Sequence, residues 1–134
     1  MNNAASFKKS TFLLAALLFG STAFSASAVR TVSASDVAKK IDQRRVGKAD
    51  FLLIDLRNEA DYAKGHLPGA VNLPVSKHVL PYGLVAQKDR EVVFYGYSGN
   101  DKAAMNTPIW AVNQGLSKVY LLEGGFKGWS GDIE

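Results

Sequence analysis

The sequence contains no cysteine, and this absence excludes more chemistry than any residue that is present. Without a thiol there is no disulfide, no thiolate metal ligand and no persulfide intermediate. The only histidines, His66 and His78, would need additional carboxylates at fixed geometry to hold a zinc ion. We therefore expect no metal site and no cofactor, and the stability of the fold must come from its hydrophobic core.

A long hydrophobic run is missing as well. The apolar stretch near the N-terminus covers only residues 11–19, whereas a transmembrane helix needs about 20 apolar residues. Lys8 and Lys9 precede this stretch, and residues 26–28 follow it as Ala-Ser-Ala. A short basic region, an apolar segment and an A-x-A site together predict a secretory signal peptide over residues 1–28.

Cleavage after Ala28 would leave a single domain over residues 29–134, located in the periplasm or secreted. No cysteine follows the cleavage site, so we expect no lipid anchor and no stable membrane anchor after processing. Loss of Lys8 and Lys9 leaves 14 basic and 12 acidic residues, a net charge of +2. These charges are scattered along the chain, which argues against a nucleic-acid partner.

Short apolar runs alternate with segments of helical spacing along this domain. After a short extended segment at residues 29–32, the apolar runs predict strands at residues 51–56, 70–73, 92–95 and 118–122. Helices are predicted at residues 35–44, at residues 58–64 and before Gly115, whereas residues 76–84 are expected to form a loop or single turns. This alternation predicts an α/β fold, with a parallel sheet covered by helices on both faces.

The candidate site is the loop that follows the strand at residues 92–95. In α/β proteins, backbone N–H groups between such a strand and the next helix often hold anions or substrates. We therefore predict a binding loop made of Gly96, Tyr97, Ser98, Gly99, Asn100, Asp101 and Lys102.

Three further residues are predicted to support this loop. Asp55 and Arg57 follow a strand, and they could form a general base with an anion clamp or an ion pair that fixes the turn. The ion pair is the interpretation we favour. His66 lies in a Gly-His-Leu-Pro-Gly turn, and we expect it to hydrogen-bond backbone groups across that turn. Ser98 does not satisfy the G-x-S-x-G pattern of a nucleophile elbow, because Gly99 comes one position early.

Three blocks of sequence resemble a single rhodanese-like domain from about residue 32 to residue 129. They are Leu53-Ile-Asp-Leu-Arg57 with the turn at residues 65–74, Val92-Val-Phe-Tyr95 before the binding loop, and residues 115–125 with Trp129. The resemblance implies a five-stranded parallel sheet flanked by helices.

In active members of this family, a cysteine opens the binding loop in the pattern C-x-x-G-x-R and becomes a persulfide. In this sequence Gly96 stands at the cysteine's position and Asp101 at the arginine's position. The resemblance therefore implies a member with no catalytic residue.

The length of the loop depends on where the next helix begins. A proline inside a helix costs about 3 kcal/mol but is tolerated at the first helical position. We therefore expect the helix to begin near Pro108 with Thr107 as its N-cap, so that the loop covers residues 96–106. In that register, Asp101 need not occupy the position of the family's arginine.

These observations together predict an exported, inactive rhodanese-like domain that acts as a binding or accessory module. Its ligand would be a small oxyanion or a protein partner. The alternative is an enzyme, either a sulfurtransferase-family member or a hydrolase, that uses a residue of the loop other than cysteine, such as Ser98 or Asp101.

Overall fold

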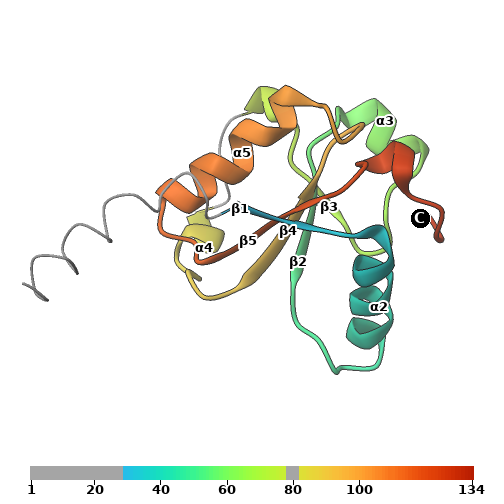
Figure 1. Ribbon diagram of the computed structural model, residues 1–134, viewed down its shortest axis with the longest axis horizontal. Coiled ribbons are helices and arrows are strands. Elements are labelled where there is room, and N and C mark those ends of the chain that lie inside the picture. The colour runs from blue at the N-terminus through green and yellow to red at the C-terminus, as the bar shows by residue number, and fades with distance from the viewer. Residues whose placement is uncertain (1–28, 78–81) are drawn as a thin grey trace, which may run out of the picture.

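Five parallel strands form one sheet in the order β1-β5-β4-β2-β3 (Figure 1). The computed structural model describes residues 29–77 and 82–134, so the predicted signal peptide and His78 lie outside the described residues. The strands are β1 (Val29–Val32), β2 (Leu52–Asp55), β3 (Val71–Asn72), β4 (Glu91–Tyr95) and β5 (Lys118–Leu122). The predicted α/β fold with a five-stranded parallel sheet is confirmed.

Helices cover both faces of the sheet. The α-helices are α2 (Ala34–Arg45), α3 (Glu59–Lys64), α4 (Tyr82–Val85) and α5 (Lys102–Asn113), and two short 3-10 turns are η1 (Val75–Lys77) and η2 (Phe126–Gly128). In Figure 1, α2, α3 and η2 lie on one side of the sheet, and α4 and α5 lie on the other. Single turns at η1 and α4 agree with the expectation for residues 76–84.

Each central strand contributes side chains to two cores, because successive residues of a strand point to opposite faces. Leu53 and Val93 pack with residues of α2, whereas Ile54 and Phe94 pack with residues of α4 and α5. All four side chains are at most 2% exposed. This explains why β2 and β4 appear in the sequence as continuous apolar runs.

Helices α2 and α3 begin within one residue of the starts predicted from the sequence. Ser33 accepts a hydrogen bond from the amide of Asp36 at the start of α2, at 3.1 Å. Asn58 accepts from the amide of Asp61 at the start of α3, at 2.8 Å, and Gly65 ends that helix. Both are side-chain caps of the type that polar residues provide.

The prediction that helix α5 begins near Pro108 is wrong. The helix begins at Lys102, and Asp101 caps it by accepting hydrogen bonds from the amides of Ala103 and Ala104. Pro108 lies inside the helix and is fully buried. The cap and the burial offset the hydrogen bond that proline cannot donate. The loop after β4 therefore covers residues 96–101 and is here called the central loop.

The segment between β5 and η2 holds the central loop from one side. Phe126 donates its amide to the carbonyl of Gly96, and Lys127 donates its amide to the carbonyl of Tyr97, both at 2.9 Å. Gly125 makes this approach possible, because a β-carbon at that position would lie 2.7 Å from the amide nitrogen of Ser98. Its φ of +58° also belongs to the left-handed region that favours glycine.

We predict that Gly125→Ala destabilises the protein more than Gly47→Ala. Gly47 has a φ of +72°, and no atom lies within 4 Å of the place that a β-carbon would take, so its replacement costs about 1 to 2 kcal/mol for backbone strain alone. Gly125→Ala adds a steric conflict worth about 1 to 3 kcal/mol. Urea denaturation of both variants measures the difference, and equal midpoints would contradict the close contact with Ser98.

Candidate functional site

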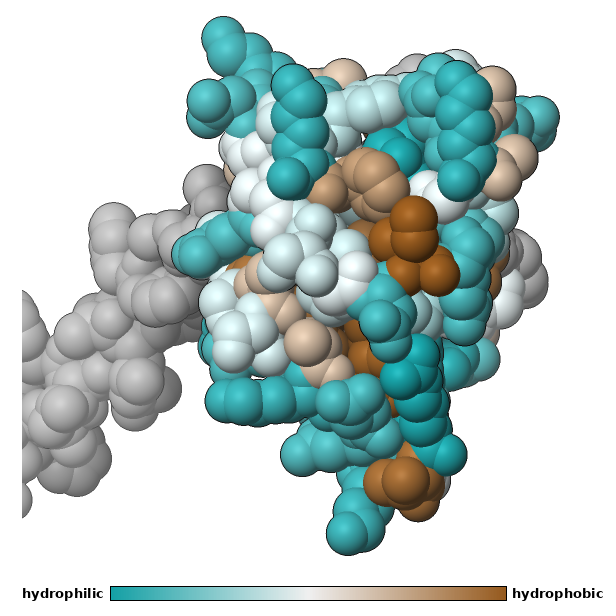
Figure 2. Space-filling model, turned by 90° about the vertical axis from the view of Figure 1, so that its right-hand side faces the viewer, coloured by the Kyte–Doolittle hydropathy of each residue, from teal (hydrophilic) through white to brown (hydrophobic). Residues whose placement is uncertain are grey.

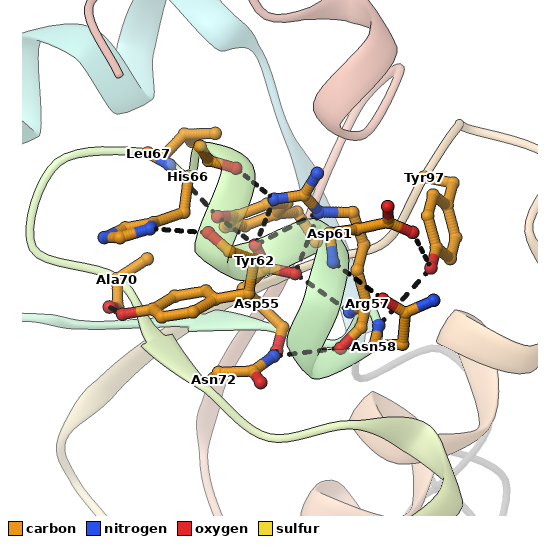
Figure 3. Close-up of polar contacts among 12 residues, drawn as sticks. Asp55, Arg57, Asn58, Asp61, Tyr62, His66, Leu67, Ala70, Asn72 and Tyr97 are labelled. Atoms are coloured by element: carbon orange, nitrogen blue, oxygen red, sulfur yellow. Dashed lines mark hydrogen bonds and ion pairs between the residues drawn. The ribbon is translucent and has the colours of Figure 1, made fainter. Parts of the chain in front are cut away.

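A buried ion pair occupies the C-terminal end of β2. Asp55 is completely buried and Arg57 is 3% exposed. The Nη2 atom of Arg57 donates to Oδ2 of Asp55 at 2.7 Å, and Nε lies 3.1 Å from both carboxylate oxygens. The backbone amide of Arg57 donates to Oδ1 of Asp55 at 2.8 Å. Figure 3 shows these contacts between β2 and α3.

This pair also binds the segments around it. Tyr95 Oη donates to Oδ2 of Asp55 at 2.6 Å and accepts from the amide of Leu67 at 3.1 Å. Arg57 Nη2 donates to the carbonyl of Gly65 at 2.6 Å, and its guanidinium carbon lies 3.7 Å from the ring centre of Phe126. The pair therefore connects β2 with β4, with the turn after α3 and with η2.

The protonation states agree with a structural ion pair. Burial acts to lower the pKa of Arg57, but the hydrogen bond and the charge of Asp55 outweigh it, so the pKa of Arg57 is raised. Burial and the hydrogen bond to Asp55 raise the pKa of Tyr95 well above its ordinary value. Tyr95 therefore stays a neutral donor at physiological pH. Because Asp55 is inaccessible to solvent, its contacts support the ion-pair interpretation rather than a general base.

His66 lies on the side of Arg57 away from Tyr97 (Figure 3). Its Nδ1 atom is 3.0 Å from the carbonyl of Tyr62, and its ring stacks on the Tyr62 ring with 3.9 Å between centroids. Its Nε2 atom is 3.9 Å from the Oε2 atom of Glu134. His66 thus hydrogen-bonds the backbone of the helix before it, and its imidazole does not contact the central loop.

The centre of the loop is taken up by Asp101. Its Oδ1 atom accepts from the amides of Ala103 and Ala104, at 3.1 and 3.2 Å, and its Oδ2 atom accepts from the amide of Tyr97 at 3.4 Å. A β-carbon built on Gly96 would lie 2.7 Å from Asp101 Oδ2 and 2.6 Å from the β-carbon of Ala104. The carboxylate therefore stands directly beside position 96.

Tyr97 connects the loop with the start of α3, a contact that the sequence did not indicate. Its Oη atom donates to Oδ2 of Asp61 at 2.7 Å and accepts from the amide of Asn58 at 3.3 Å. The hydrogen bond raises the pKa of Tyr97 and lowers the pKa of Asp61. Asn58 and Asp61 are recognisable as the cap and first turn of a helix, but no local signal connects them with a residue 36 or 39 positions away.

The remaining residues of the predicted binding loop are half-buried at Ser98 and exposed at Gly99 and Asn100. Within the described residues, the amides of these three residues donate no hydrogen bond to a protein acceptor. Lys102, the first residue of α5, is exposed and makes no ion pair within the described part of the chain. The predicted binding loop therefore keeps unpaired amide donors beside the carboxylate of Asp101.

Metal ligands and membrane spans can be assessed over residues 29–77 and 82–134. No group of three or more histidine or acidic side chains in these ranges is arranged to hold a metal ion. No helix in the same ranges is long and apolar enough to cross a membrane.

The chain belongs to the family of rhodanese-like domains, because the family model matches residues 33–132. A sulfurtransferase of Allochromatium vinosum is 33% identical over 94 residues, which cover 69% of this chain and 84% of that protein. The thiosulfate sulfurtransferase GlpE of Coxiella burnetii is 32% identical over 84 residues, which cover 63% of this chain and 76% of that protein.

Solved structures show the same fold. A rhodanese-related protein of Thermoplasma volcanium superposes with a TM-score of 0.61 at 18% identity, covering 78% of this chain and 97% of that one. A protein of Rhodopseudomonas palustris described as a possible tyrosine phosphatase gives a TM-score of 0.62 at 26% identity, covering 82% and 88% of the two chains.

We predict that Asp55→Asn lowers the free energy of unfolding by about 3 to 5 kcal/mol, because it leaves the Arg57 charge buried without a partner. The control is Asp42→Asn, which breaks an exposed ion pair with Arg45 and is expected to change stability by less than about 0.5 kcal/mol. Chemical denaturation measures both. Similar losses in the two variants would contradict a stabilising role of the buried pair.

Proposed function

We propose that this protein is a rhodanese-like domain without sulfurtransferase activity that acts as a binding or accessory module. The observation that carries the proposal is Gly96, which stands where the family resemblance places the catalytic cysteine, in a chain that contains no cysteine at all. A glycine has no atom that can accept and release a sulfur atom. The names of the related sulfurtransferases therefore do not transfer to this chain.

The surroundings of Gly96 support the same conclusion. The Oδ2 atom of Asp101 stands where a side chain at position 96 would begin. A neighbouring carboxylate disfavours a second negative charge. It would therefore oppose both a thiolate at this position and an anionic sulfur donor in the loop.

A hydrolase that uses Ser98 or Asp101 receives less support. A serine nucleophile needs a base within hydrogen-bonding reach. His66 faces Tyr62 and Glu134 instead, and both oxygens of Asp101 accept backbone hydrogen bonds.

Two kinds of ligand remain for the module, a small oxyanion and a protein partner. Over residues 29–77 and 82–134, the amides of residues 98–100 donate no hydrogen bond and Lys102 makes no ion pair, which favours an oxyanion. The exposed Tyr97 favours a protein, as does the adjacent helix α5, which exposes Met105, Ile109 and Trp110 by 37 to 40%. We propose the protein partner, because aromatic and methionine side chains are enriched at such interfaces.

The opposite surface offers less for such a contact. The face that carries α2, α3 and the C-terminal segment is largely hydrophilic, and its hydrophobic patches are small and separate (Figure 2). Four of the seven exposed large hydrophobic residues in the described part of the chain lie between Tyr97 and Trp110. The central loop and α5 are thus the best candidate for a contact surface.

We predict that the purified protein forms no thiocyanate from thiosulfate and cyanide, and that its mass shows no bound sulfur after incubation with thiosulfate. Turnover at the rate of a thiol-dependent sulfurtransferase, measured in parallel, would overturn the proposal. The assay tests the absence of the nucleophile directly, because no other residue of the chain can form a persulfide.

Matched variants test the reason for the inactivity. Gly96→Cys alone is expected to stay inactive, because its β-carbon meets Asp101 and Ala104 and its thiol lies beside a carboxylate. Gly96→Cys combined with Asp101→Ser and Ala104→Gly removes both the carboxylate and the neighbouring β-carbon, and is expected to take up sulfur from thiosulfate. Asp101→Ser combined with Ala104→Gly is the control and should take up none.

We also propose that the protein is exported, as the pattern of residues 1–28 indicates. When the full chain is expressed in a bacterium, we predict that it is recovered from the periplasm or medium with Val29 as its first residue. Recovery of unprocessed protein only from the cytoplasm would contradict export. Cross-linking of this exported protein should capture a partner that is lost with Tyr97→Ser and kept with the distant Val46→Ser.

A further inference from the structure

We infer that Asp101 is an internal ligand of the central loop and that it keeps small oxyanions out of the native protein. This inference deepens the proposed function, since it removes one of the two ligand classes considered for the same loop. Oxyanion binding and sulfur transfer are measured separately, so either statement can fail without the other.

The first observation is that Asp101 does more than cap a helix. An ordinary N-cap side chain accepts from amides of the first helical turn, as Oδ1 of Asp101 does with Ala103 and Ala104. The Oδ2 atom turns back toward the loop and accepts from the amide of Tyr97 at 3.4 Å. One carboxylate thus joins the two ends of the central loop, as a bound anion would.

The second observation concerns Gly96. Its φ does not lie in the left-handed region, so its backbone conformation does not require glycine. The space around it does, because a β-carbon would come within 2.6 Å of the β-carbon of Ala104 and within 2.7 Å of Asp101 Oδ2. Glycine at position 96 therefore leaves the room that the carboxylate of Asp101 occupies beside α5.

The loop cannot easily widen to admit a second anion. The amides of Phe126 and Lys127 hold the carbonyls of Gly96 and Tyr97, and the tyrosine ring is fixed to Asp61. An incoming oxyanion would have to displace the carboxylate from its three amides or sit against it, and like charges in contact repel. Within the described residues, the amides of Ser98, Gly99 and Asn100 donate no hydrogen bond, but they lie in the same six-residue loop as the carboxylate of Asp101, whose charge opposes an anion there.

To test the inference, the ¹⁵N-labelled full chain is titrated with sodium sulfate and with sodium thiosulfate at constant ionic strength. The chemical shifts of the amides of Tyr97, Ala103 and Ala104 are measured by NMR during each titration. The native protein should show no saturable shift. Asp101→Ser keeps a capping oxygen but removes the carboxylate, and should bind both anions at least tenfold more tightly. Asp42→Asn is the control, because it removes an exposed carboxylate on α2 that makes no contact used in this argument, and it should behave as the native protein.

Two results would overturn the inference. One is saturable binding to the native protein with the affinity of Asp101→Ser. The other is an Asp101→Ser variant that is folded by circular dichroism and binds neither anion. If Asp101→Ser is unfolded, the same titration is carried out on Asp101→Asn. This variant keeps the shape of the side chain and one capping oxygen but removes the negative charge. Binding by Asp101→Asn supports the inference, and its absence refutes it.

Discussion

The rest of the structure depends on one buried ion pair, between Asp55 and Arg57. Charges taken out of water are costly unless they are paired and fully hydrogen-bonded. Here Tyr95, the carbonyl of Gly65 and the ring of Phe126 complete the surroundings of the pair. These partners come from β4, from the turn after α3 and from η2, so the pair fixes three segments that are far apart in the sequence.

The buried ion pair also helps to position the central loop. Phe126 stacks on Arg57 through its ring and holds the carbonyl of Gly96 through its amide. The same residue therefore connects the buried pair with the loop. A frame of this kind must persist for the domain to fold, whether or not the loop carries out a reaction. Its presence in this chain is evidence of family membership and stability rather than of activity.

Local signals in the sequence predicted much of this fold. The apolar runs marked β2, β4 and β5, and helical spacing with turn signals marked α2 and α3 to within one residue, because these patterns depend on neighbouring residues. The start of α5 was missed for a physical reason. The cost of a proline in a helix is a local property, whereas the burial of Pro108 and the capping by Asp101 are decided by tertiary packing.

The site shows the same division. The ion pair and the loop after β4 were recognisable from local patterns, whereas the assignment of Gly96 to the nucleophile's position stays a prediction. The contacts of Tyr97 with Asp61 and of Gly125 with Ser98 were not recognisable, because they join residues 36 and 27 positions apart (97 − 61 and 125 − 98), beyond the reach of helical or strand periodicity.

Gly96 and Asp101, at the two ends of the central loop, fit each other. Gly96 leaves room for the carboxylate of Asp101, and that carboxylate accepts hydrogen bonds from the amides of Tyr97, Ala103 and Ala104. A side chain at position 96 would meet both this carboxylate and the β-carbon of Ala104. The proposed absence of sulfurtransferase activity therefore involves more than the residue at position 96. The same fit fixes the loop in a form that exposes Tyr97 and Lys102.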